Sequence, residues 1–351
     1  MLFNGDLTTT CPTRQKIRDF YRIDENAVID HILPLAEVGV KARSRAWERA
    51  RQIVLNIRKD QDGQSGVDAL LNEFSLSSEE GVVLMCLAEA LLRVPDKATQ
   101  DTLIRDKLAK GDWSSHLGSS DSLFVNASSW GLLVTGKMVN YTDKTKEQQF
   151  GMLKKTIGRL GEPVIRKSVN FAMKIMGKQF VMGRTIDEAI ERAAEKEQKG
   201  YVYSYDMLGE GARTMKDAKR YFDSYMNAIH AIGKAANGRV KSPGISVKLS
   251  AIHPRYEFTH KDRVMAEIVP KLKELALAAK KYDIGFTVDA EEADRLDISL
   301  DVIEAVFSDE DLGNWQGFGL AVQAYQKRAI FVIEWVTELA TRVGRKMMVR
   351  L

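Results

Sequence analysis

The second half of the chain alternates short apolar runs with longer amphipathic segments. The apolar runs, rich in valine, tyrosine and phenylalanine, cover residues 201–208, 244–250, 285–290, 317–324 and 346–351. Segments with apolar residues at helical spacing separate them, at residues 214–236, 260–282, 298–307 and 326–343. Repeated alternation of this kind is typical of parallel strands joined by crossover helices. The pattern therefore predicts an α/β domain from near residue 184 onward.

The first 200 residues show helical periodicity almost throughout. Residues 25–59 predict one or two helices, and Ser77 with Glu80 forms a capping box ahead of the apolar run "GVVLMCLAEALL". A second capping box, Thr185 with Glu188, predicts a helix that ends at Gly200. We therefore expect a helical first half.

Each predicted strand carries one polar residue near its C-terminal end. The last four strands read "ISVKL", "FTVDA", "LAVQA" and "MMVRL", and the first reads "YVYSYDML", so the polar residues are Asp206, Lys248, Asp289, Gln323 and Arg350. A fully buried parallel strand is normally apolar throughout. In a (β/α)8 barrel, catalytic residues lie at this end of the strands. The pattern favours a ring of functional groups at a barrel mouth, and the alternative is that these groups only neutralise one another.

Length, charge and cysteine content argue against several classes of protein. The 351 residues exceed the usual size of one domain, and the net charge of +4 is spread along the chain, which gives no case for a nucleic-acid surface. Two cysteines are too few for a disulfide framework, and the five histidines lack the spacing of metal ligands. No run of about 18 apolar residues and no signal peptide is present. We expect a cytoplasmic protein.

The five predicted strands are too few to close a barrel. A (β/α)8 barrel takes about 250 residues. No G-x-G-x-x-G follows a predicted strand, so a dinucleotide-binding doubly wound sheet has no support. We therefore expect an incomplete barrel that stops after its fifth strand. Its open edges, residues 201–208 and 346–351, would favour association into a homo-oligomer.

Four stretches closely resemble the proline dehydrogenase domain of bacterial proline utilization A (PutA). They are "GYVYSYDMLGEGA", "PGISVKLSAIHPRY", "DAEEADRLDISLDVIE" and "AVQAYQKRA". The resemblance implies a helical arm over residues 1–60, a helical domain over 61–181, and the first five βα units of an FAD-binding (βα)8 barrel over 182–351. It also implies that the parent protein carries an L-glutamate γ-semialdehyde dehydrogenase. Some members of the family begin with a ribbon-helix-helix domain; we expect none here, and no DNA binding by this chain.

The activity that the resemblance implies is FAD-dependent oxidation of L-proline to 1-pyrroline-5-carboxylate. In that family, electrons pass from the reduced flavin to a membrane quinone, so the complete protein is expected to be peripheral at the inner membrane face. The paired arginines of the substrate site and further flavin contacts belong to family segments after the fifth strand. We therefore expect the chain by itself to bind FAD poorly and to have little activity.

The resemblance also implies residue roles. Lys248 would pair with the substrate carboxylate, and Asp206 and Glu210 would pair with active-site arginines, with Glu210 forming a gate over the bound substrate. The residues at the flavin would be Asp289, Ala290, Gln323 and Arg350, and Leu351 would begin the wall of the substrate pocket.

Two other functions stay open on the residues alone. A lysine near the C-terminal end of a barrel strand is also how Schiff-base aldolases present their nucleophile, so Lys248 fits such a lyase. The helical first half could instead serve as a non-catalytic interaction module. Borohydride trapping would identify the first, and indifference to replacement of Lys248 would identify the second.

Overall fold

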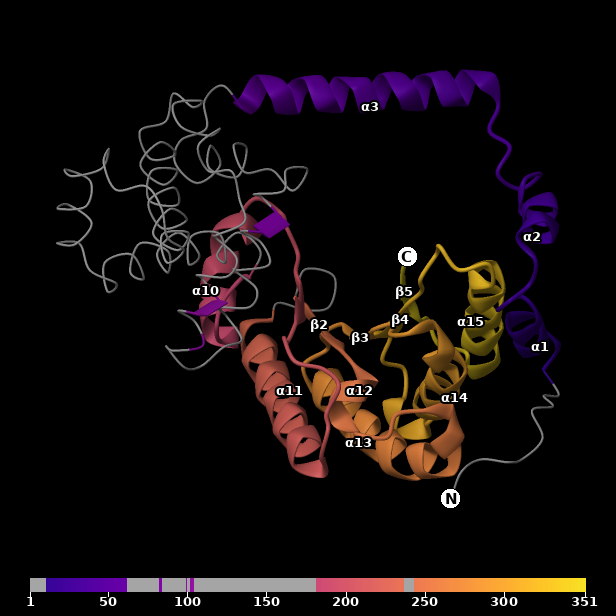
Figure 1. Cartoon of the computed structure of the whole chain (residues 1–351). Coiled ribbons are helices and arrows are strands. Elements are labelled where there is room, and N and C mark those ends of the chain that lie inside the picture. The colour runs from indigo at the N-terminus through magenta and orange to yellow at the C-terminus, as the bar shows by residue number, and fades with distance from the viewer. Residues whose placement is uncertain (1–10, 62–81, 84–98, 100–101, 104–180, 237–242) are drawn as a thin grey trace, which may run out of the picture. The chain divides into compact units, whose positions relative to one another are not determined.

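The computed structural model describes residues 11–61, 82–83, 99, 102–103, 181–236 and 243–351 (Figure 1). The chain forms two compact units, one of Met1–Glu37 with Gly183–Leu351 and the other of Val38–Met182. The second unit is described chiefly through α3 (Val40–Gln61). The capping box predicted at Ser77 lies outside the described residues. The predicted arm, residues 1–60, includes residues of both units. The domain boundaries predicted at residues 60 and 181 remain predictions.

Five parallel strands form one sheet in the order of the sequence. The strands are β1 (Ser204–Asp206), β2 (Gly244–Val247), β3 (Phe286–Val288), β4 (Phe318–Ala321) and β5 (Met348–Arg350). Each pairs in parallel with the next. Because such crossovers are right-handed, sequential parallel order places all connecting helices on one face. This is the topology of a TIM-type barrel, whereas a doubly wound sheet reverses its strand order. The predicted fold class is confirmed.

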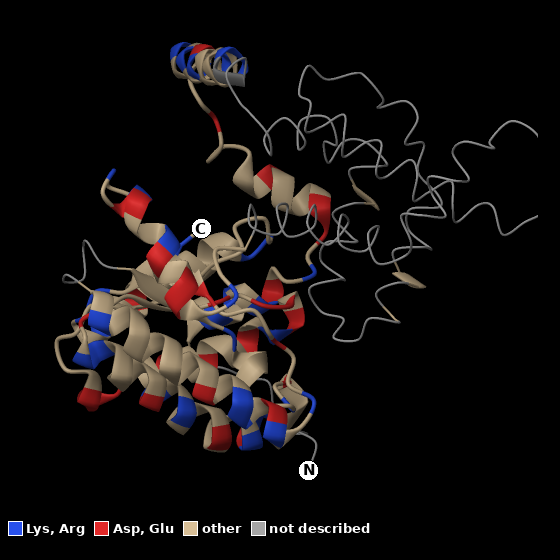
Figure 2. Ribbon diagram, turned by 90° about the vertical axis from the view of Figure 1, so that its left-hand side faces the viewer, with Lys and Arg blue, Asp and Glu red and all other residues tan. Residues whose placement is uncertain are grey.

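Helices cover the outer side of this sheet (Figure 1). Those between the strands are α11 (Met215–Ala235), α12 (Leu249–Ile252), α13 (Lys261–Lys281), α14 (Leu296–Phe307) and α15 (Ala329–Val343), with 3-10 turns at Phe258–His260, Ala293–Arg295 and Glu310–Leu312. Helices α1 (Pro12–Asp19), α2 (Glu25–Ile32) and α10 (Ile186–Glu197) precede β1. Acidic and basic residues are mixed along them rather than segregated by sign (Figure 2). None of the helices that the structure describes is both long and apolar enough to cross a membrane.

Side chains alternate strictly between the two faces of each strand. Ile245 and Val247 of β2, like Phe286 and Val288 of β3, are buried on the face covered by helices. The residues between them face the other way, where the hydroxyl oxygens of Ser204 and Ser246 lie 3.2 Å apart. Every second residue of a strand lies on the same face, so the polar residue at the end of each strand also lies on this second face. The fold therefore directs the predicted polar ring into the interior of the barrel arc.

Helix capping is partly as predicted. Thr185 accepts a hydrogen bond from the Glu188 backbone at 3.2 Å, but the Glu188 carboxylate accepts from the backbone of Arg184, one residue before the cap. Helix α10 ends at Glu197 rather than at Gly200, which follows in a turn with φ of 88°. A complete capping box begins α11 at Thr214, where the sequence pattern predicts the start of a helix but not its cap.

The N-terminal helix α1 packs against α15, and its polar residues reach α14 as well. Arg14 is buried, with its guanidinium 2.8 Å from a carboxylate oxygen of Asp297 and 2.7 Å from one of Asp301 on α14. Thr13 donates to Glu338 of α15 at 2.7 Å. Charge-assisted hydrogen bonds of this kind are short and strong. Helix α1 therefore holds α14 and α15 in a fixed relation.

Candidate active site

Acidic and basic side chains from separate strands meet at the C-terminal edge of the sheet. Asp206 ends β1, and Lys248 follows β2 directly. The Lys248 Nζ donates to both carboxylate oxygens of Asp206, each at 2.8 Å, and to Asp289 Oδ2 at 3.1 Å. The carboxylate of Glu210 lies 3.8 Å from the same ammonium. One lysine thus sits among three carboxylates.

Arg350, at the end of β5, joins the cluster from the other side. Its guanidinium donates to Ser246 Oγ at 2.9 Å and to Asp289 Oδ1. The buried carboxylate of Asp289 therefore bridges two cations, with one oxygen turned to Lys248 and the other to Arg350. This bridge fixes the two positive charges side by side at the edge of the sheet.

The environment of Lys248 keeps it charged. Its side chain is 16% exposed, and burial alone lowers the pKa of the ammonium. The hydrogen bonds to Asp206 and Asp289 outweigh burial, so the net pKa is raised above 10.5. A Schiff-base nucleophile needs the neutral amine. The geometry therefore suits binding of an anion and disfavours the aldolase. The mutual neutralisation that the sequence left open is present as well.

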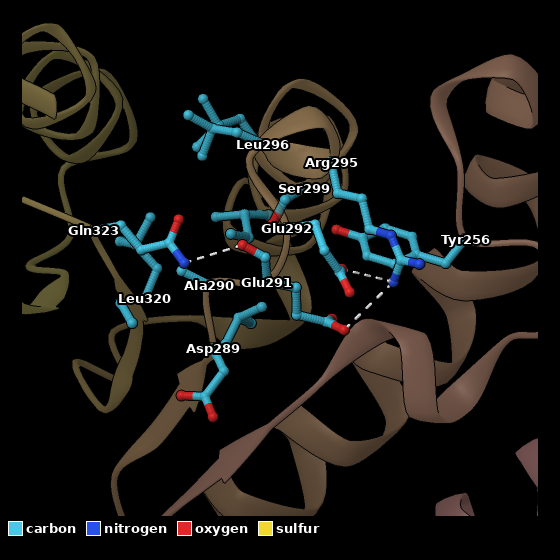
Figure 3. Close-up of a pocket in the computed structure, with 14 residues that line it drawn as sticks. Tyr256, Asp289, Ala290, Glu291, Glu292, Arg295, Leu296, Ser299, Leu320 and Gln323 are labelled. Carbon is cyan, nitrogen blue, oxygen red and sulfur yellow. Dashed lines mark hydrogen bonds and ion pairs between the residues drawn. The ribbon is translucent and has the colours of Figure 1, made fainter. Parts of the chain in front are cut away.

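A pocket lies beside this cluster, between the ends of β3 and β4 and the start of α14 (Figure 3). Asp289, Ala290 and Gln323, all predicted at the flavin, line it. The Gln323 side chain donates to the backbone oxygen of Glu291 at 3.0 Å, while the Asp289 carboxylate turns away toward Lys248. Across the pocket, the Arg295 guanidinium lies near two carboxylates, as Figure 3 shows.

The loop that carries Glu210 is tied to the rest of the mouth through Ser250. Gly209 and Gly211, on either side of Glu210, have φ of 122° and 62°, values that favour glycine. The backbone of Gly211 donates to Ser250 Oγ at 3.2 Å, and the Ser250 backbone donates to Glu291 Oε1 at 3.1 Å. Burial raises the pKa of the Glu291 carboxyl. The segments that follow β1, β2 and β3 are thus held together.

Sequence reasoning missed several of these residues. Ser246 and Ser250 read as ordinary strand and loop serines, although the inward alternation of β2 could have marked Ser246. Glu291 follows two predicted site residues in "DAEE", and that position was the available signal. Leu351 was predicted to begin a pocket wall; the residue is 78% exposed in the described structure.

Comparison with known families shows what kind of protein carries this site. The family model described as "Proline dehydrogenase" matches residues 189–351, and the one described as "Proline utilization A proline dehydrogenase N-terminal domain" matches residues 12–58. The bifunctional protein PutA of Klebsiella aerogenes is 52% identical over 343 residues, and that of Escherichia coli K12 is 52% identical over 344 residues. The chain belongs to the PutA proline dehydrogenase family.

The matches cover nearly all of this chain but only part of the PutA relatives. They take in 96% and 97% of the chain and 26% of each of the two relatives, so the chain spans about a quarter of their length. A crystal structure of a point mutant of Bradyrhizobium japonicum PutA is 46% identical, with a TM-score of 0.62, over 94% of this chain and 33% of that one. Proline dehydrogenases of the PutA family are flavin-dependent.

One expectation is corrected by these comparisons. A third family model, described as "DNA-binding domain of Proline dehydrogenase", matches residues 66–180. Our expectation of no DNA binding by this chain conflicts with this match. The reason is that the expectation considered only a ribbon-helix-helix segment at the N-terminus, whereas the match falls on residues 66–180. Almost all of these residues lie outside the described part of the chain, and the site described above belongs to the α/β part.

Proposed function

We propose that this chain forms part of the active site of an FAD-dependent L-proline dehydrogenase, which oxidises L-proline to 1-pyrroline-5-carboxylate on the way to glutamate. The observation that carries the proposal is the Asp289 bridge. It holds Lys248 and Arg350 side by side at the C-terminal edge of a parallel sheet, next to a pocket lined by Ala290 and Gln323. The membership of the chain in a flavin-dependent family supports it.

The polar groups at the edge of the pocket suit one edge of an isoalloxazine ring. Such a ring offers carbonyl acceptors and an N–H donor at one edge, and the bound flavin supplies the acceptor for the hydride that leaves proline. Gln323 can donate and accept, and the small side chain of Ala290 lets a flat ring approach. Arg350, half-exposed, would stabilise the negative charge of the reduced ring. We propose Asp289, Ala290, Gln323 and Arg350 as the flavin-binding residues.

Lys248 is proposed to hold the carboxylate of proline. All three N–H groups of the ammonium are occupied, two of them by Asp206 and one by Asp289. The Asp206 side chain is 45% exposed, so water can replace a bond that it gives up, whereas Asp289 is buried. A substrate carboxylate would therefore displace one oxygen of Asp206 and leave the Asp289 bridge intact. In this way Lys248 fixes the ring of proline in orientation.

Glu210 is proposed to close over the substrate. Its side chain is 64% exposed, on a loop whose flanking glycines permit backbone rotation. Leu351 would begin the pocket wall, as the resemblance implies. The finer proposals taken from the family are electron transfer to a membrane quinone, a peripheral location at the inner membrane face, a homo-oligomer, and the domain boundaries at residues 60 and 181.

The test is a chimera in which residues 1–351 replace the matched segment of the Escherichia coli relative. A chimera is needed because we expect the isolated chain to bind FAD poorly. L-Proline added without oxygen should bleach the flavin absorbance, and D-proline should not. A chimera that holds flavin but does not respond to L-proline would contradict the proposal. Borohydride-dependent trapping of a carbonyl substrate on Lys248 would favour the aldolase instead.

A further inference from the structure

Arg328, between β4 and α15, is a buried arginine that the proposed function does not use. Arg328 is only 2% exposed. Its guanidinium lies 4.0 Å from the ring centre of Tyr21 and donates to the backbone oxygen of Ala293. Within the part of the chain that the structure describes, no carboxylate forms an ion pair with it. Buried arginines are usually paired, so another role is needed to account for its position.

The guanidinium starts a chain of hydrogen bonds that ends in the pocket. Arg328 Nε donates to Gln326 Oε1 at 2.9 Å. Gln326 Nε2 donates to Gln323 Oε1, and Gln323 Nε2 donates to the backbone oxygen of Glu291 at 3.0 Å. All three bonds run in the same direction, from the arginine toward the pocket.

The direction follows from donor chemistry. A guanidinium has only N–H donors, so Gln326 must turn its carbonyl oxygen to Arg328 and its NH₂ group to the next amide. Gln323 must then accept with its oxygen and donate with its nitrogen. If Gln323 were reversed, its oxygen would face the carbonyl oxygen of Glu291, and two acceptors would be left without a proton.

We propose that Arg328 is a positioning residue, which fixes the orientation of the Gln323 amide in the pocket by acting through Gln326. Fixed in this way, Gln323 keeps one N–H and one lone pair of its oxygen free for a ligand. The consequence for flavin rests on the proposed function. The Tyr21 ring lies next to the guanidinium, so the N-terminal segment contacts the outer end of the relay.

Gln326→Glu separates positioning from simple support. A carboxylate accepts more strongly from Arg328 but has no N–H to donate, so Gln323 must turn its NH₂ group to residue 326 and lose its bond to Glu291. If Arg328 and Gln326 only stabilise the fold, Gln326→Glu should leave the Tm unchanged or raise it, and should leave flavin affinity unchanged. Positioning predicts an unchanged or higher Tm together with a flavin Kd in the chimera that is at least tenfold higher. Arg328→Lys keeps the donor, and its Kd should stay within threefold of wild type, whereas Arg328→Met should weaken binding.

A readout without flavin tests the relay in the full chain. With ¹⁵N-labelled glutamine, the side-chain amide signals of Gln323 should shift in Gln326→Glu and stay in place in Arg328→Lys. Gln198→Glu, an exposed site on the surface, controls for added charge and should leave those signals unchanged. Unshifted signals in Gln326→Glu would overturn the proposal, whatever happens to flavin affinity. If the wild-type chimera holds no flavin, the proposed function fails, and the amide signals alone still decide the relay.

Discussion

Replacing Lys248 with methionine removes the ammonium at the centre of the site. Methionine keeps most of the apolar stem, so the change isolates the charge and its three hydrogen bonds. Asp206 and Asp289 would then face each other without the cation between them, and Arg350 would be left as the partner of Asp289. We expect lower stability and loss of proline binding.

The size of the effect follows from exposure. The bonds to Asp206, which is nearly half-exposed, are screened by water and contribute about 0–1 kcal/mol. The bond to buried Asp289 contributes about 1.5–3 kcal/mol, and Arg350 compensates part of its loss. The free energy of unfolding should therefore fall by about 2–3 kcal/mol. For a unit of this size, that corresponds to a decrease in Tm of roughly 5–10 °C.

The assay is thermal unfolding of the full chain, followed by the proline response of the chimera. Lys219→Met is a matched control, because Lys219 bonds both oxygens of Asp223, at 2.9 and 2.7 Å, on the exposed surface of α11. This control should lose less than about 0.5 kcal/mol. In the chimera, Lys248→Met should raise the KM for proline at least a hundredfold, and Lys219→Met should leave it unchanged.

The contribution of Lys248 to stability should depend on pH in a defined direction. Because the folded pKa of Lys248 is raised above 10.5, its contribution is complete below that pH and is lost as pH rises through the folded pKa. The difference in stability between wild type and Lys248→Met should be the same at pH 7 and pH 9 and should shrink above about 10.5. Equal Tm values for the two proteins, with an unchanged KM for proline, would refute the reasoning.

Three further substitutions test the scaffold. Arg14→Met removes one cation from Asp297 and one from Asp301, which keep Arg18 and Lys261 as partners, and should cost about 1.5–3 kcal/mol, measured by urea unfolding; an unchanged urea midpoint would contradict this. Gly319→Ala would place a methyl group in steric conflict with the Met348 backbone oxygen, and should cost about 1–3 kcal/mol and separate β4 from β5, seen as faster hydrogen exchange in β5. Burial holds the pKa of His253 below 6.5, although Glu267 opposes this shift, so the folded state binds fewer protons and stability falls as pH drops below that value. His253→Gln should flatten that dependence between pH 7 and 5, and an unchanged slope would exclude His253 as its source.

The ring of polar residues was predictable because it depends only on local rules. A single polar residue in an otherwise apolar strand stands out, and the alternation of side chains assigns it to one face. Asp206, Lys248, Asp289 and Arg350 could therefore be placed together before any contact was known. The strand ends were less accurate. Tyr203 accepts a hydrogen bond from the Gly244 backbone, but the paired register with β2 begins only at Ser204, so β1 is three residues long and the rest of the predicted run, residues 201–203, precedes it.

The contacts between distant segments could not be predicted in the same way. Arg14 and Asp297 are 283 positions apart, and neither residue differs in type from many exposed charged residues in the chain. Their pairing depends on where α1 meets α14, which no local pattern specifies. The relay from Arg328 to Gln323 was similarly hidden, since "VQAYQKRA" shows two glutamines and an arginine but not the direction of their hydrogen bonds.

The most direct test of the central claim is a crystal structure of the chimera with FAD and L-proline bound under anaerobic conditions. We predict the flavin ring against Arg350 and Gln323, and the proline carboxylate about 3 Å from Lys248 Nζ. We also predict that the Asp289 bridge persists. Flavin or proline bound away from the C-terminal edge of the sheet, with Lys248 still held only by Asp206 and Asp289, would contradict the account.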